Sequence, residues 1–297
     1  MKLERMVVAV DFMEPGLEAA RWAAIHFAPD SALRLVHVIQ VPTPPFFLRG
    51  LYPSPDELVE MAEEGARTRL EELARDLRRA RRGSVDTDVR SGQPHEEIEA
   101  AAREHAADLI VVGHHAPRGG VWEVLGTTAE RLIHGSGVPV LLADHLPGGS
   151  PDQILAPIDG GELDARILEA VRELAGRFGA TVTALHVLPM PLHEHVRVVS
   201  SAEKADEVDR DARRGAQGWL AERLEEAGFA EGSVEALVAL GDPAFEIVVT
   251  ATRHASTLII MGTRGEGLLA RSLFGSVANG VFRSAPCPVL TIPARAA

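Results

Sequence analysis

Short runs of β-branched and aliphatic residues alternate along the chain with longer segments in which apolar residues recur at helical spacing. After the apolar run 154–159, for example, the apolar residues of 168–178 fall on one face of a helix. Charged segments at 54–82 and 199–228 predict amphipathic helices with a solvated face. Strands that alternate with helices in this way indicate an α/β fold with a parallel sheet and helices on both faces.

The same pattern is written twice. The apolar runs MVVAVDF, LRLVHVI, DLIVVG and VPVLLA of the first half return in order as ILAPIDG, VTALHVL, TLIIMG and CPVLTI. The offset is 148 residues from Asp11 to Asp159 and 149 from Gly113 to Gly262. A Pro/Gly/Ser-rich stretch at 145–153 is typical of a domain linker. We therefore predict two tandem α/β domains, 1–148 and 149–297.

Composition narrows the function classes. The 43 acidic and 30 basic residues give a net charge of −13, which disfavours nucleic-acid and anionic membrane partners. The single cysteine, Cys287, begins an apolar run and is interpreted as a core residue rather than a nucleophile. No apolar stretch approaches the length of about 18 residues that spans a membrane, and no signal-peptide pattern is present. A cytoplasmic protein is expected.

Two features follow the predicted strands at the edge where such sheets bind ligands. Asp11 and Asp159 close the first apolar run of each copy, where an aspartate either caps the next helix or contacts a ligand. Val38 and Val187 stand near the end of the second run, where a valine either packs in the core or lies against a base.

A glycine-bearing stretch after the fourth strand of the second copy is the strongest candidate. Gly262 and Gly265 are separated by two residues, and Gly265 and Gly275 by nine, with Ser276 directly after. Glycine lets backbone amides approach phosphate oxygens, and a helix beginning near Ser276 would point its first amides at the same charge. Arg264 could add a charged hydrogen bond.

A plain strand-to-helix turn, with Ser276 as the helix cap, is the alternative for this stretch. Strand-to-helix connections usually take about 2–6 residues. The stretch between Gly262 and Ser276 is about twice as long as that, which favours a functional loop.

These residues resemble the universal stress protein family. The resemblance covers nearly the whole chain twice, and its most specific element is the pattern G-x2-G-x9-G-[ST], which the second copy satisfies in full. The LHV triplet at 185–187 and the CPVL run at 287–290 also match. The family fold is a Rossmann-like or flavodoxin-like domain with strand order 3-2-1-4-5.

The resemblance implies that the second domain binds ATP, with Mg²⁺ as an optional companion. It assigns the adenosine portion to Asp159, Val187 and Met261. It assigns ribose and phosphates to the motif and its surroundings, namely Gly262, Arg264, Gly265, Gly275, Ser276 and Val277.

The first copy departs from this pattern. Ala116 stands where the second copy has Gly265, and its methyl group would disfavour positive φ and the close approach of a phosphate. His115 stands where the second copy has Arg264. The remaining first-copy candidates are Asp11, Val38, Gly113, Gly126 and Thr127. We expect weaker nucleotide binding in this copy, or none.

Other chemistries lack their signatures. The chain contains no Walker A sequence, no dinucleotide G-x-G-x-x-G pattern and no nucleophile elbow. Histidines at 114–115, 193 and 195 lack the partners that would complete a metal site. No catalytic residue is assigned, so weak ATPase activity or autophosphorylation is the most that we expect of an enzyme.

Three functions remain open: a nucleotide-binding stress regulator, a nucleotide-independent interaction module and, ranked last, an adenine-nucleotide enzyme. By resemblance, the two domains would also pair as an internal pseudo-dimer through 138–143 and 287–292, with a homodimer as a further option.

Overall fold

The computed structural model describes residues 1–40, 55–113, 126–188, 202–263 and 276–294, with side chains except at 55–59 and 202–206. The chain forms two compact units, one from Lys2 to Asp144 and the other from His145 onward, referred to below as the first and second domains. The predicted boundary near Gly149 lies between the last strand of one and the first strand of the other.

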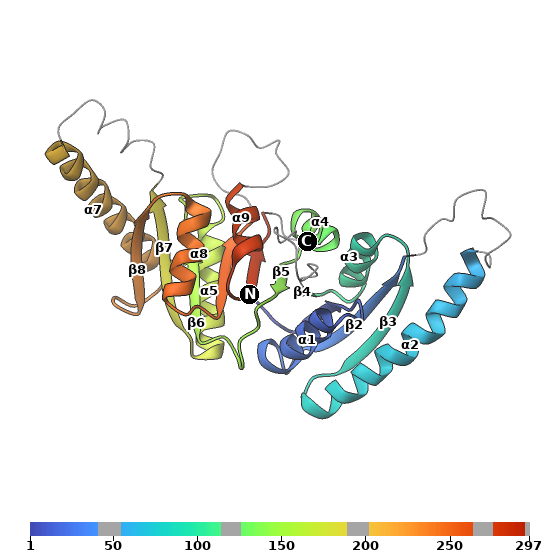
Figure 1. The fold of residues 1–297 in the computed structure, drawn as a ribbon. Helices are drawn as coiled ribbons and strands as arrows, with labels where there is room; N and C mark the ends of the chain where they lie inside the picture. The colour runs from blue at the N-terminus through green and yellow to red at the C-terminus, as the bar shows by residue number, and fades with distance from the viewer. Residues whose placement is uncertain (41–54, 114–125, 189–201, 264–275, 295–297) are drawn as a thin grey trace, which may run out of the picture. The chain divides into compact units, whose positions relative to one another are not determined.

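The first domain is a parallel sheet with strand order β3-β2-β1-β4-β5 (Figure 1). Its strands are β1 (Arg5–Ala9), β2 (Ala32–Ile39), β3 (Val85–Ser91), β4 (Leu109–Gly113) and β5 (Val140–Ala143). Its helices are α1 (Glu14–Trp22), the π-helix η1 (Ala23–Phe27), α2 (Pro55–Ala80), α3 (Pro94–Glu104) and α4 (Thr127–Gly135). The predicted strand order is confirmed.

The second domain repeats this plan with the order β8-β7-β6-β9-β10, again all parallel. Its strands are β6 (Gln153–Pro157), β7 (Thr181–Leu188), β8 (Val234–Leu240), β9 (Leu258–Gly262) and β10 (Val289–Ile292). Its helices are α5 (Asp164–Phe178), α7 (Ala202–Glu226), α8 (Pro243–Arg253) and α9 (Ser276–Ser284).

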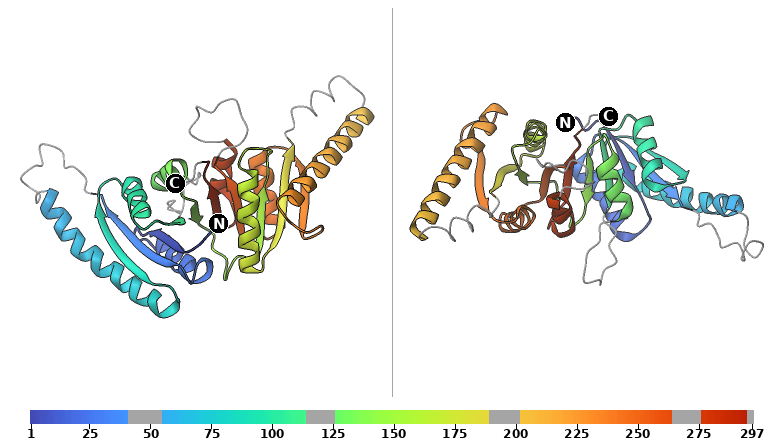
Figure 2. Two further views of the ribbon diagram at one scale, coloured as in Figure 1. Left: turned by 180° about the vertical axis from the view of Figure 1, so that it is seen from behind. Right: turned by 90° about the horizontal axis from the view of Figure 1, so that it is seen from above.

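Helices cover both faces of each sheet, as the alternating pattern predicts. In the first domain α2 packs on β2 and β3, whereas α3 packs on β1 and β2 from the opposite face (Figures 1 and 2). In the second domain α7 lies along β8 in the same way that α2 lies along β3. Central strands are therefore buried on both sides, and β4 and β9 are apolar throughout until their final glycine.

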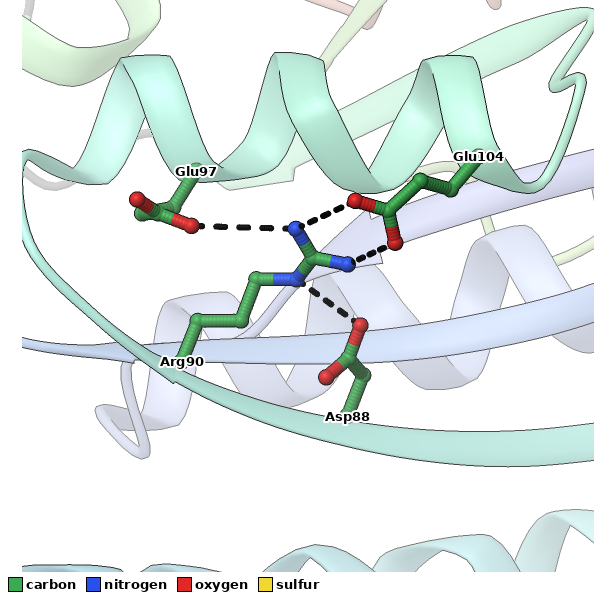
Figure 3. A network of polar contacts seen from close by, with 4 residues as sticks. All are labelled: Asp88, Arg90, Glu97 and Glu104. Carbon is green, nitrogen blue, oxygen red and sulfur yellow. Dashed lines mark hydrogen bonds and ion pairs between the residues drawn. The ribbon is translucent and has the colours of Figure 1, made fainter.

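Strand β3 is the last strand at one end of the first domain's sheet, and it carries charged side chains. Arg90 is bound by three carboxylates: Nε lies 2.8 Å from Asp88, one terminal nitrogen lies 3.7 Å from Glu97, and both terminal nitrogens contact Glu104 (Figure 3). The hydrogen bond from Arg90 lowers the pKa of Glu104. This network ties β3 to α3.

Candidate functional site

The carboxyl ends of β6, β7 and β9 bring together the residues of the second domain that the sequence selects. Because these strands are parallel and β6 lies between the other two, their ends meet at one edge of the sheet. Val187 is half-buried next to the end of β7, and Met261 and Gly262 end β9. Ser276 is the first residue of α9 and is exposed, as the prediction of a helix beginning there requires.

Asp159 lies in the turn after β6, two residues beyond the strand end. Its Oδ1 accepts a hydrogen bond of 3.0 Å from the backbone amide of Gly161, and Gly160 has φ +94°. The helix α5 begins only at Asp164, with Leu163 as its N-cap residue. Asp159 is therefore not the N-cap of α5: it organises its own turn and keeps an exposed carboxylate at the sheet edge.

Asp164 is a residue that sequence reasoning missed. Its Oδ2 accepts a hydrogen bond of 2.9 Å from the amide of Gly160, and the residue is 6% exposed. Its other oxygen, Oδ1, is buried without a hydrogen-bond partner among the described residues. Burial, with the neighbouring charge of Asp159 adding to it, raises the pKa of Asp164 to about 6. Two carboxyl groups thus bind two consecutive amides of one turn.

His186 supports the same turn from the strand next to it. Its Nδ1 donates to the carbonyl oxygen of Ile158 at 2.8 Å, which fixes the backbone immediately before Asp159. The ring of Trp219, from α7, lies 4.8 Å from the histidine ring. Successive strand residues point to opposite faces, so this contact places Val187 on the other face of β7.

The first domain carries the matching set. Asp11 Oδ1 accepts from the amide of Met13 at 2.9 Å, and His37 Nδ1 donates to the carbonyl of Val10 at 2.7 Å. Val38 is half-buried near the end of β2, and Gly113 ends β4.

Gly126 and Thr127 complete the described candidates of the first domain. Gly126 is the N-cap residue of α4, and Thr127 is its first residue, as Ser276 is the first residue of α9. The strand-to-helix framework of the motif is therefore the same in the two domains.

The two domains differ where the first helix meets the fourth strand. Gly16 stands five residues after Asp11, where the second domain has Asp164 five residues after Asp159. A Cβ at Gly16 would lie 2.3 Å from Oδ1 of Asp11, and one at Gly113 would lie 2.9 Å from Cα of Gly16. The backbone of α1 therefore packs directly against the end of β4, and this arrangement has no room for a side chain.

Sequence comparison identifies the repeat. The pattern of the universal stress protein family matches residues 2–144 and again residues 151–293. The chain belongs to the universal stress protein family.

Some relatives in this family match along the whole chain and others match one domain. A universal stress protein of Mycolicibacterium smegmatis is 28% identical over 98% of this chain and 97% of its own length. A universal stress protein of Methanocaldococcus jannaschii is 31% identical over 47% of this chain and 81% of its own length, which is one domain. The crystal structure of a universal stress protein from Archaeoglobus fulgidus superposes with a TM-score of 0.72 at 20% identity, covering 98% of this chain and 97% of that one.

Several residues of the predicted universal stress protein motif lie outside the described part of the chain. These are Arg264, Gly265 and Gly275 in the second domain and His115, with Ala116, in the first. Histidines 114, 193 and 195 fall outside it as well. Among the residues that are described, no three His, Cys, Asp or Glu side chains gather as a metal ion would require. Within the same part of the chain, no helix is both long and apolar enough to cross a membrane.

Proposed function

We propose that this universal stress protein binds ATP at the carboxyl edge of its second domain and acts as a stress-response regulator. The observation that carries the proposal is the placement of the motif. Gly262 ends β9, Ser276 begins α9, and the sequence between them supplies the remaining glycines at the family spacing. Many members of this family bind ATP.

The described residues fit such a ligand. Val187 offers a half-buried apolar surface at the strand end, suited to a base, and the exposed carboxylate of Asp159 offers an acceptor beside it. Gly262 has no side chain to obstruct a close approach. The first amides of α9, beginning at Ser276 and Val277, have no partner within the helix and suit a phosphate group. Arg264 and Gly265 would add to this cradle.

Regulation requires that ATP bind one conformation or assembly of the protein more tightly than another. Bound nucleotide would then shift a partner-binding equilibrium, and turnover would be secondary. The interaction-module function applies to the first domain, which we propose binds nucleotide weakly or not at all. Ala116 in its motif and the close packing of Gly16 on Gly113 both support this asymmetry.

The test is to denature freshly purified protein, identify any released nucleotide and titrate nucleotide-free protein with ATP in a calorimeter. We expect about one ATP per chain, because only the second copy has glycine at the second motif position. Gly265→Ala should weaken this binding, and Ala116→Gly is the matched control at the equivalent position of the first domain. Unchanged ATP affinity in Gly265→Ala would refute the site.

A further inference from the structure

The turn after β6 holds two carboxyl groups on adjacent amides. Asp159 accepts from Gly161 N at 3.0 Å and Asp164 accepts from Gly160 N at 2.9 Å. Consecutive amides place the two carboxyl groups next to each other. Oδ1 of Asp164 is buried and has no hydrogen-bond partner among the described residues, and the residue is only 6% exposed. A buried carboxyl oxygen beside a second carboxyl is satisfied most simply by a proton between them.

Few other charges face this pair from the elements packed on α5. The strands β6 and β9 contribute no titratable side chain between Gln153 and Pro157 or between Leu258 and Gly262. The one titratable side chain of β7 is His186, and its Nδ1 is already hydrogen-bonded to the carbonyl oxygen of Ile158.

On α5 itself, the nearest cation to Asp164 is Arg166, whose guanidinium donates to the carbonyl of Pro293 at 2.6 Å. Glu162 precedes the helix and is exposed. Arg264, which the motif assigns to phosphate, belongs to the stretch outside the described residues. Among the described residues, Asp159 is therefore the principal charge that acts on Asp164.

We propose that Asp164 shares a proton with Asp159 and that loss of this proton weakens the binding of nucleotide phosphate in the second domain. This inference rests on the proposed function and adds its regulation. Asp164 acts as a positioning residue: it holds the turn that presents Asp159 and sets the charge of the site.

The direction follows from the charges. The pKa of Asp164 is raised to about 6, so its carboxyl group is protonated below that pH and adds a negative charge to the turn above it. This added charge repels an anionic phosphate, so affinity falls as the pH rises through this range. Gly16 occupies the equivalent position of the first domain, which therefore lacks the second carboxyl group.

The experiment measures the ATP dissociation constant of the wild type and of Asp164→Asn between about pH 5 and pH 8, the range that brackets the titration. The asparagine can keep the bond from Gly160 and donate to Asp159, which imitates the protonated pair. The ratio of the two constants cancels the titration of ATP itself. We expect a ratio near one at the acidic end, rising to about tenfold weaker binding by the wild type at the basic end.

Two further variants serve as controls for this experiment. Glu169→Gln removes one charge from an exposed position of the same helix, and its ratio to the wild type should not change with pH. Asp164→Gly introduces the residue of the first domain and also removes the acceptor of the Gly160 amide, so its ratio to the wild type should change with pH as that of the asparagine variant does, with a pH-independent loss of affinity added. Carbon-13 NMR of the carboxyl groups in nucleotide-free protein supplies a readout that needs no ligand. The Asp164 carboxyl group should titrate near its raised pKa of about 6.

The outcomes separate the two claims. ATP binding with a ratio that stays flat across the range overturns the regulatory inference and leaves the proposed function standing. Titration of Asp164 at the ordinary pKa of an aspartate also overturns it. If none of the variants binds ATP at any pH, the proposed function fails and the inference falls with it, whatever the NMR titration shows.

Discussion

In the two domains, the histidine near the end of the second strand is covered by an aromatic ring from a different element. In the first, the ring of Phe12, in the turn after β1, lies 4.4 Å from His37, and Arg69 of α2 covers that ring at 4.3 Å. In the second, the turn has Gly160 instead, and Trp219 of α7 reaches in to cover His186. A Cβ at Gly160 would lie 3.7 Å from the Trp219 ring.

The residue differences in the turn and in the helix compensate for each other. Arg69 and Trp219 each precede a fully buried leucine of their helix, so they occupy matching positions. An aromatic ring is supplied once in each domain, by the turn or by the helix but not by both. Phe12 adopts φ 60°, a left-handed conformation that costs a non-glycine residue free energy, whereas Gly160 adopts φ +94° without that cost. The histidine, its carbonyl partner and the nearby aspartate are the parts that stay the same.

The C-terminal end of the first helix also differs between the two domains. In the second domain α5 stops at Gly179, which takes the left-handed conformation that commonly ends a helix. In the first domain the π-helix η1 follows α1, and the guanidinium of Arg81 donates to backbone carbonyls of Ala24, Ala28, Ser31 and Ser84 at 2.7–3.2 Å. Arg81 is 7% exposed. A buried arginine therefore binds carbonyl groups at and beyond the helix end in the first domain, whereas a left-handed glycine ends the helix in the second.

The largest effect should come from Arg81→Met. The substitution leaves buried carbonyl groups without their donor and should lower the free energy of unfolding of the first domain by about 3 kcal/mol. Urea unfolding of single-tryptophan versions follows the domains separately, because Trp22 lies in the first domain and Trp219 in the second. We expect the Trp22 transition alone to shift.

Arg82→Met is the matched control for this prediction. The Arg82 side chain is 88% exposed and lies 3.7 Å from Asp30, so its loss should cost less than about 0.5 kcal/mol. Equal effects of the two substitutions would show that the buried guanidinium does not hold the helix end.

A smaller effect should come from converting the second domain to the arrangement of the first. Gly160→Phe places a ring against Trp219 at a positive φ, and Trp219→Arg uncovers His186, so each should cost about 2 kcal/mol. The double substitution recreates the pair Phe12 and Arg69 and should recover about 1–2 kcal/mol of the summed loss. Urea unfolding of the four proteins gives this coupling energy. Additive losses would mean that the exchange is not compensatory.

Much of this architecture can be predicted from the sequence. The repeated apolar runs predict the strands and a parallel sheet, and the family resemblance supplies the order of the strands. The spacing of the motif places Gly262 at a strand end and Ser276 at a helix start. These features are local, or are repeated so clearly that one copy checks the other.

The features that escaped prediction depend on contacts between distant residues. Asp164 looks in sequence like an ordinary acidic residue in the first turn of a helix, where such residues are favourable. Only the fold shows that it is buried beside Asp159. Likewise, nothing near His186 in the sequence indicates that Trp219, a helix away, covers it, or that Phe12 performs this role in the other copy.

The smallest effect concerns the position two residues before the last strand of each domain, where the residue type differs. Cys287 stands where the first domain has Val138, and both are buried, at 3% and 8% exposure. The interpretation of Cys287 as a core residue is confirmed. Because the two side chains have similar size and lie in similar surroundings, Cys287→Val should change the free energy of unfolding by less than about 0.5 kcal/mol.

The reactivity of the Cys287 thiol provides a second test of the comparison with Val138. Burial raises the pKa of Cys287 to about 12, so at neutral pH the thiol is protonated as well as shielded and should not react with an alkylating reagent. Labelling should become fast only in urea concentrations that unfold the second domain, at the midpoint that Trp219 fluorescence reports. Rapid labelling in native buffer would show that this strand opens to solvent, in which case cysteine and valine would not be equivalent here.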